Sequence, residues 1–252
     1  MNDVQFEQEY IVQTYETDQR GFARPVALLN YLQAAAGEHA ARLGVAVSDL
    51  RKNGHTWVLS RLHLAMERYP RCGDTVCIRT WPAVRDRLFT VRDFELFTLD
   101  GSQTGRATTS WAVLNIKTRR PMKLEEVLPI YTINAERALN DPFSTLPILE
   151  GEEYALHLPV LRGDLDINRH VNNTVYAGWA LETIPEEVDS TCQLSAIEIS
   201  FRAEALYGDT IVARTGRSEE AHTYLHSIDN ELDGRELARI RTSWSPLDTT
   251  HR

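Results

Sequence analysis

The sequence predicts an α+β fold built twice, in which each half is an apolar helix wrapped by an antiparallel sheet. Three observations in the 252-residue chain lead to this prediction. One helical pattern opens each half, runs rich in β-branched and aromatic residues follow each helix, and short motifs recur in the same order in both halves. We therefore expect a tandem repeat of one α+β unit.

The helix of the first half is expected between Pro25, which suits a first turn, and Gly44, which suits a stop. Positions on one face recur every three or four residues: Leu28, Leu32, Ala35, His39 and Leu43. We interpret His39 on this face as a core residue. A similar pattern opens the second half and is expected to end at Pro185; it consists of Val175, Tyr176, Trp179 and Ala180.

Four strands are expected after each helix, because the runs that follow are rich in residues typical of sheets. In the first half they lie at about 57–68, 75–82, 88–99 and 104–116. In the second half they lie at about 194–204, 210–217, 223–231 and 236–247. The strands of each half are expected to pair as hairpins, since Asp100-Gly101 and Asp233-Gly234 are strong turn signals.

Specific residues also correspond between the halves. The stretch Cys72–Val76 matches Tyr207–Ile211 at an offset of 135 residues, and Thr109–Trp111 matches Thr242–Trp244 at an offset of 133. Residues 117–153 between the halves contain four of the ten prolines and show no clean periodicity, as a connector would. We expect an N-terminal domain over 1–150, including the connector 117–150, and a C-terminal domain over 151–252. A long helix followed by antiparallel strands, repeated once, is a tandem or double hotdog.

Composition excludes several classes of protein. With 42% hydrophobic and 25% charged residues, the chain is expected to be globular rather than disordered. The charge of 27 minus 36, or −9, argues against a general nucleic-acid binder. Three cysteines, no apolar leader and no membrane-length apolar run predict a cytoplasmic protein without a membrane partner. Nucleotide, metal and redox motifs are absent from the sequence, so no cofactor and no metal are expected.

The segment Asp164–Asn173 carries the densest polar chemistry in the chain. It holds two aspartates, three asparagines and a histidine in ten residues, directly ahead of the second helix. Such a group is costly to bury without a reason. One interpretation is structural, with Asn172 or Asn173 capping the helix and the rest of the loop solvated. The other is a catalytic site.

The stretch Asp164–Glu182, DLDINRHVNNTVYAGWALE, resembles the second-domain signature of the acyl-acyl-carrier-protein thioesterases, which end fatty-acid synthesis in plant plastids and have bacterial relatives. The likeness covers nearly the whole chain. In the first half it includes Asn53–Arg61, Arg68–Pro70, Thr80–Trp81, Arg106–Ala107 and Asn115–Pro121. The resemblance implies a double-hotdog enzyme that hydrolyses fatty acyl-acyl carrier protein, with its acyl tunnel mainly in the first half.

The resemblance also implies the catalytic residues, which match Asp166, Asn168, His170 and Glu204. The spacing of two would put the first three on one side of an extended loop. Glu204 is expected on the strand after the second helix. Glu198, six residues earlier, is an alternative base if it faces the same side. Many plant members carry a cysteine directly after the glutamate that matches Glu204, whereas this sequence has Ala205 there. Cys192 lies outside the motif. A cysteine acyl-enzyme is therefore not expected.

Thioester hydrolysis needs a positioned water, a base and donors for the oxyanion. We expect Glu204 to act as the base, with His170 and Asn168 orienting it or the water and Asp166 keeping them in register. Direct attack by Glu204 to form a mixed anhydride is left open. The helix that begins near Asn172 offers backbone N–H groups to an oxyanion. We expect substrate contacts from Asn172, Asn173 and Trp57.

A basic surface is expected to bind the acidic acyl carrier protein. Residues 61–123 contain 12 Lys and Arg against 6 Asp and Glu, a local charge of +6. The densest cluster, named here the basic turn, consists of Lys117, Arg119, Arg120 and Lys123. Individual cations of this region have an equally simple interpretation as solvated outer strand faces.

Three alternative functions remain: an acyl-coenzyme A thioesterase, a hotdog hydratase and a non-catalytic acyl-binding protein. A hydratase is disfavoured because Glu204 follows the thioesterase pattern. An acyl-binding protein would be expected to have lost the polar set, which is intact here. The sequence leaves open the chain length of the substrate and the oligomeric state, including a homodimer.

Overall fold

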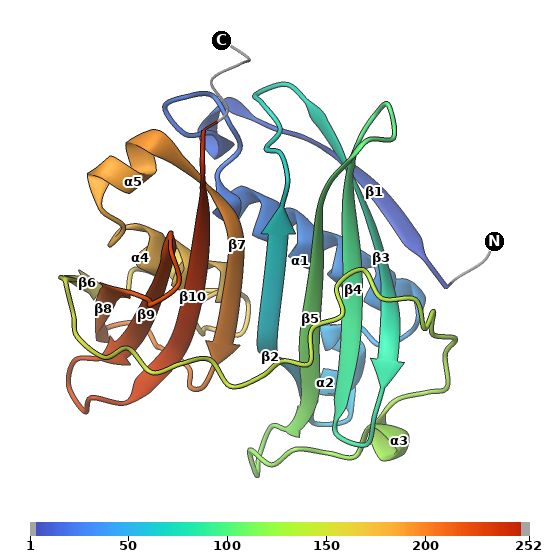
Figure 1. Ribbon diagram of the computed structural model, residues 1–252. Helices are drawn as coiled ribbons and strands as arrows, with labels where there is room; N and C mark the ends of the chain where they lie inside the picture. Colours follow the sequence, from blue (N-terminus) through green and yellow to red (C-terminus); the bar gives the residue numbers. More distant parts are fainter. Residues whose placement is uncertain (1–3, 248–252) are drawn as a thin grey trace. The chain divides into compact units, whose positions relative to one another are not determined.

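The computed structural model describes residues 4–247, and the chain divides into two compact units, Met1–Pro142 and Phe143–Arg252. The division falls within the proline-containing connector. No helix in the described range has the length and apolarity that crossing a bilayer requires. Each unit has its own antiparallel strands and its own helices (Figure 1).

The first unit contains five strands that pair antiparallel in the order β1-β3-β4-β5-β2. Its elements are β1 (Phe6–Ile11), the 3₁₀ turn η1 (Thr14–Glu16), α1 (Pro25–Arg42), α2 (Val47–Lys52), β2 (His55–Met66), β3 (Thr75–Arg85), β4 (Phe89–Thr98), β5 (Gln103–Asn115) and α3 (Leu124–Val127). Helix α1 packs against β3 and β1.

Helix α1 follows from the apolar face read in the sequence. Leu28, Leu32, Ala35 and His39 are all at most 2% exposed, so this face lies in the core. Pro25 occupies the first turn, and Gly44, just beyond the helix, takes a φ of +70°, which glycine adopts without steric cost. The interpretation of His39 as a core residue is confirmed. Its Nδ1 lies 3.0 Å from Nη1 of Arg92 and accepts a hydrogen bond from it.

The second unit repeats the arrangement, with the sheet order β6-β8-β9-β10-β7. Its elements are β6 (Tyr154–Pro159), η2 (Arg162–Asp164), α4 (Asn173–Leu181), α5 (Glu186–Thr191), β7 (Cys192–Phe201), β8 (Thr210–Arg217), β9 (Thr223–Asn230) and β10 (Glu236–Pro246). Helix α4 packs against β8, β9 and β10. Strand for strand, this is the order of the first unit, which confirms the internal repeat.

The repeat extends to single hydrogen bonds. Trp111 Nε1 donates to Thr109 Oγ1 at 2.9 Å in the first unit, and Trp244 Nε1 donates to Thr242 Oγ1 at 3.0 Å in the second. Both matched Asp-Gly pairs form the hairpin turns expected of them, β4–β5 and β9–β10. The short motifs in the sequence therefore mark equivalent places in the two units.

Two expectations about the elements were wrong. Each unit has a fifth strand ahead of its helix, β1 or β6; both strands lie at a sheet edge and are mostly exposed, so they lack a regular apolar alternation. The second helix ends at Leu181 rather than at Pro185. Pro185 instead stands at the N-cap of α5, where its missing N–H costs no hydrogen bond.

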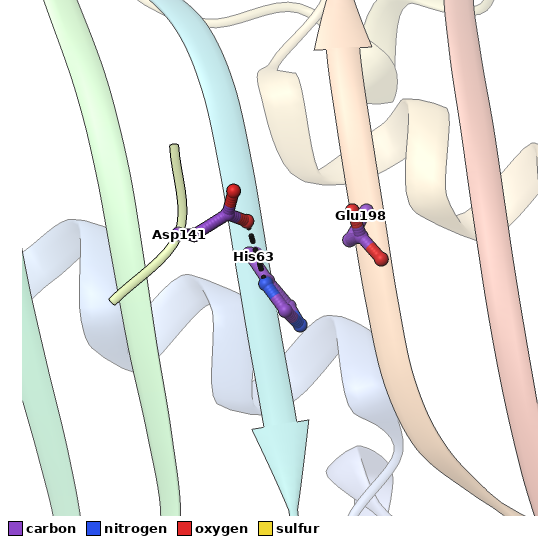
Figure 2. A group of neighbouring side chains, drawn as sticks. All are labelled: His63, Asp141 and Glu198. Carbon is purple, nitrogen blue, oxygen red and sulfur yellow. Dashed lines mark hydrogen bonds and ion pairs between the residues drawn. The ribbon is translucent and has the colours of Figure 1, made fainter. Parts of the chain in front are cut away.

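The connector is fixed to the sheet of the first unit. Asp93 on β4 is fully buried and binds Arg137 Nε at 2.9 Å and the backbone N of Ala138 at 2.8 Å. His63 on β2 pairs with Asp141, with 2.7 Å between Nδ1 and Oδ2 (Figure 2). These contacts explain why a segment without regular secondary structure belongs to the compact first unit.

A chain of hydrogen bonds runs through the core of the second unit around His226, which is fully buried. Nδ1 of His226 lies 2.6 Å from Thr215 Oγ1, and Nε2 lies 2.9 Å from Thr242 Oγ1. Thr215 bonds in turn to Thr183, whose hydroxyl donates to the carbonyl of Ala180. That carbonyl can only accept, so Thr183 and Thr215 each donate toward it, and Nδ1 of His226 donates to Thr215. Thr242, which accepts from the Trp244 indole, still has a proton to donate to Nε2, so the chain accommodates a neutral His226 with its proton on Nδ1.

Candidate active site

Asp166 organises the polar loop ahead of α4. Its Oδ1 accepts from the backbone N–H of Asn168 at 2.7 Å and of His170 at 3.3 Å, while Oδ2 accepts from Asn168 Nδ2 at 2.9 Å. The backbone closes the same turn, since Asp166 N donates to His170 O at 2.8 Å and Arg169 takes a φ of +64°. The loop is therefore a tight turn, and the expected alternation of an extended segment was wrong.

The first unit contains the same turn with other side chains. Asp18 Oδ1 accepts from the backbone N–H groups of Arg20 at 2.9 Å and Phe22 at 3.0 Å, and Asp18 N donates to Phe22 O at 2.8 Å. Gly21 takes the positive φ there. Asp166 thus has a counterpart in shaping the turn, whereas the polar Asn168 and His170 replace Arg20 and Phe22 and are specific to the second unit.

The loop brings His170 next to Glu204. His170 Nδ1 and Glu204 Oε1 lie 3.2 Å apart, and both side chains are 33% exposed. His170 also forms an isolated backbone bridge with Leu206, two residues beyond Glu204. The pair is thus within hydrogen-bond reach and open to solvent, as a site that uses water requires.

Glu204 lies beyond the strand on which it was expected, because β7 ends at Phe201. The alternation argument for Glu198 therefore does not apply. Glu198 is on β7, and its carboxylate accepts two hydrogen bonds from Arg241, the shorter at 2.6 Å. Cys192, at the start of β7, is buried.

The start of α4 is capped as the structural interpretation of the loop suggested. Asn172 is the N-cap, and its side-chain oxygen accepts from Thr174 N at 3.2 Å. Asn173 is the first helical residue and is half-buried. The helix thus begins directly after the loop of Asp166 and His170, with its positive end at the polar cluster.

Sequence reasoning missed a role for Tyr176, because the pattern of apolar residues in α4 marks it only as a core residue. It is 2% exposed, and its hydroxyl accepts from the backbone N of Ala205 at 2.9 Å. Burial, with a smaller contribution from the charge of Glu204, raises the pKa of the Tyr176 hydroxyl to about 12. Tyr176 therefore remains protonated at neutral pH.

The remaining predicted site residues lie in the first unit. Trp57 on β2 is half-buried, donates its indole N–H to Val45 O at 2.8 Å, and packs against the buried cluster that includes Leu50 and Val113. Within the basic turn after β5, Lys117, Arg119 and Arg120 are exposed. Its fourth member, Lys123, pairs with Glu126 at 2.8 Å.

Comparison with known proteins adds independent evidence. Residues 3–131 match the acyl-ACP thioesterase N-terminal domain and residues 149–246 match the C-terminal domain, where ACP is acyl carrier protein. Oleoyl-acyl carrier protein thioesterase 1, chloroplastic, from Arabidopsis thaliana is 30% identical over 95% of this chain and 75% of its own length.

Solved structures agree with this match. An acyl-ACP thioesterase from Bacteroides thetaiotaomicron superposes with a TM-score of 0.87 at 25% identity, covering 97% of this chain and 100% of its own. A 12:0-ACP thioesterase from Umbellularia californica gives a TM-score of 0.85 at 25% identity over 97% of this chain and 98% of its own. The prediction of a double hotdog is thereby confirmed. With both domain models matched in order across the chain, this protein belongs to the acyl-ACP thioesterase family of thioester hydrolases.

Proposed function

We propose that this protein hydrolyses the thioester of a fatty acyl-acyl carrier protein to a free fatty acid and carrier protein, with Glu204 as the general base. The observation that carries the proposal is the His170–Glu204 pair, 3.2 Å apart and partly solvent-exposed, directly before the start of α4. Membership of the family supports the reaction and the substrate class.

Glu204 would take a proton from the attacking water, and His170 would hold the carboxylate in place. A thioester is already activated, so one positioned base and donors for the oxyanion are sufficient. Asn168, held through its own side chain by Asp166, would orient the water. Asp166 contacts the backbone of the turn, so its role is to keep Asn168 and His170 in register.

The oxyanion would form at the start of α4. Backbone N–H groups at a helix N-terminus, together with the positive end of the helix, favour a developing negative charge. Asn173 at the first helical position supplies such an N–H group, while Asn172 caps the turn. The acyl chain would contact the apolar residues of the first unit, where Trp57 lies in the cluster around Val45.

Thiol release from acyl carrier proteins loaded with short, medium and long acyl chains tests this proposal, beside the matching coenzyme A esters. Glu204→Gln is expected to lower kcat by about 100-fold or more, in line with loss of a general base. Glu182→Gln, which changes an exposed glutamate at the C-cap of α4, is the matched control and should retain full activity. Glu198→Gln tests the alternative base.

Three results would contradict the proposal. Activity only on coenzyme A esters would move the protein to the acyl-coenzyme A thioesterases, and undiminished activity in Glu204→Gln would remove Glu204 as the base. Absence of thiol release from every ester would favour an acyl-binding protein. The chain-length profile of the wild type measures the substrate preference directly.

The basic turn is the proposed docking surface for the carrier protein. Lys117, Arg119 and Arg120 are exposed on one turn, in a region of net charge +6 on a protein of net charge −9. The double change Arg119→Glu/Arg120→Glu is expected to raise KM for the carrier-bound substrate, more at low salt, with kcat unchanged. An unchanged KM would refute this docking role. KM for the coenzyme A ester serves as the internal control.

A further inference from the structure

Glu204 lies on a short segment between β7 and β8 that other parts of the second unit hold in place. Before Glu204, the backbone N of Ala203 donates to Leu237 O at 3.1 Å. After it, the N–H of Ala205 donates to the Tyr176 hydroxyl, and the carbonyl of Ala205 accepts from Val171 N at 3.2 Å. The Tyr176 hydroxyl is therefore the side-chain support next to the proposed base.

The hydroxyl of Tyr176 is the hydrogen-bond acceptor for a buried backbone N–H, that of Ala205. Ala205 is fully buried, so its N–H has no access to water. A buried N–H without an acceptor costs as much as a lost hydrogen bond, and the segment would move to satisfy it. Tyr176 also lies within hydrogen-bond range of Ala203 O, at 3.5 Å, so one hydroxyl contacts the backbone on both sides of Glu204.

At the equivalent place in the first unit there is no backbone N–H that needs an acceptor. There, Ala23 N donates to Pro70 O at 2.9 Å, as Val171 N does to Ala205 O, so Pro70 stands where Ala205 stands. Proline has no N–H. Leu28, the fourth residue of α1, occupies the position of Tyr176, the fourth residue of α4. The unit without the N–H thus carries no hydroxyl to accept it.

The residue that corresponds to Glu204 in the first unit is Tyr69, directly before Pro70. Tyr69 is 9% exposed, and its hydroxyl is buried without a hydrogen-bond partner. Its side chain therefore fills space. Three equivalent positions therefore differ together between the units. The second unit has Tyr176, Glu204 and Ala205, where the first has Leu28, Tyr69 and Pro70. The hydroxyl of Tyr176 thus occurs in the unit that carries Glu204.

We propose that Tyr176 is a positioning residue for Glu204, which acts by accepting the Ala205 N–H and thereby fixing the segment that carries the carboxylate. The proposal rests on the proposed role of Glu204 as the base. Tyr176 takes no part in proton transfer. A misplacement of the base by a fraction of its hydrogen-bond reach is sufficient to lower the rate, because proton abstraction depends on close geometry.

Tyr176→Phe is the first test, because it removes only the hydroxyl. We expect kcat for carrier-bound substrate to fall about 10- to 100-fold while KM changes by less than about twofold. Tyr69→Phe is the matched control: it removes a buried hydroxyl that has no partner, and both kcat and KM should equal those of the wild type. Melting temperatures of both variants establish that each is folded at the assay temperature.

A double-mutant cycle separates positioning from a general loss of structure. If Tyr176 acts through Glu204, adding Tyr176→Phe to Glu204→Gln should lower kcat no further, because the base is already absent. A full additional loss on the Glu204→Gln background would overturn the proposal, as would an undiminished kcat in Tyr176→Phe alone. The second of these results leaves the proposed function intact, whereas absence of thiol release by the wild type would refute both.

A second pair of variants keeps the test decisive if Tyr176→Phe fails to fold. Tyr176→Leu leaves the Ala205 N–H without its acceptor, and adding Ala205→Pro then removes that N–H, which reproduces Leu28 and Pro70 of the first unit. The double variant should have a higher kcat than Tyr176→Leu alone. An equal or lower kcat would contradict the role assigned to this hydrogen bond.

Discussion

Replacement of His226 by Gln should weaken the dependence of stability on acid pH. His226 lies in the core of the second unit, between the hydroxyls of Thr215 and Thr242. Burial lowers the pKa of this histidine from the ordinary value of 6.5 to about 3. The folded protein therefore keeps His226 neutral under conditions in which the unfolded chain protonates it.

The sign and size of the effect follow from proton linkage. Between pH 6.5 and about pH 3 the unfolded state binds one proton more than the folded state at this residue, so the free energy of unfolding falls as the pH falls. Each pH unit within that window is worth about 1.4 kcal/mol. By pH 5 the loss due to His226 should reach about 2 kcal/mol, and over the whole window it should approach about 5 kcal/mol.

Urea unfolding of the wild type and of His226→Gln at several pH values from 7 to 5 measures this loss. The variant is expected to start less stable at pH 7, because it disrupts the hydroxyl chain, and then to lose about 2 kcal/mol less than the wild type by pH 5. Parallel losses in the wild type and His226→Gln would refute the reasoning.

Four further substitutions test how the backbone of the structure is supported, each by urea unfolding at pH 7. Asn172→Ala removes the N-cap of α4 and should cost about 1 kcal/mol; an unchanged stability would show that the cap is not used. Gly216→Ala would place a Cβ 2.3 Å from the carbonyl oxygen of Gly151 and should lower the free energy of unfolding by about 1–3 kcal/mol. Gly37→Ala, on the open face of α1, should instead raise it by about 0.5–1 kcal/mol. Arg169→Gly relieves a positive φ and should stabilise by about 1 kcal/mol, and a loss of stability there would contradict the backbone assignment.

Much of the fold could be predicted because local signals were strong. The apolar face of α1, the Asp-Gly turns and the eight strands that follow the helices each depend on neighbouring residues, whose periodicity the sequence displays. The edge strands β1 and β6 were missed for the same reason. Their side chains are mostly exposed, so burial imposes no alternation on them.

The candidate site was predictable as a set of residues and only in part as a geometry. The polar loop and Glu204 were found from the motif, yet the turn around Asp166 depends on a positive φ at Arg169, a residue type that rarely signals one. The contact between His170 and Glu204 joins residues 34 positions apart. Such a contact depends on how β7 ends and how the loop packs beside it, which no local pattern encodes.

By itself, the sequence determined the repeated α+β unit, its helices and most of its strands, and the polar loop, because hydrophobic periodicity and turn chemistry act over a few residues. Only the tertiary structure decided that Glu204 rather than Glu198 faces His170, and that Tyr176 supports the segment of Glu204. The physical reason lies in the buried backbone. An N–H such as that of Ala205 must find an acceptor, and which side chain supplies it is settled only when distant segments pack together.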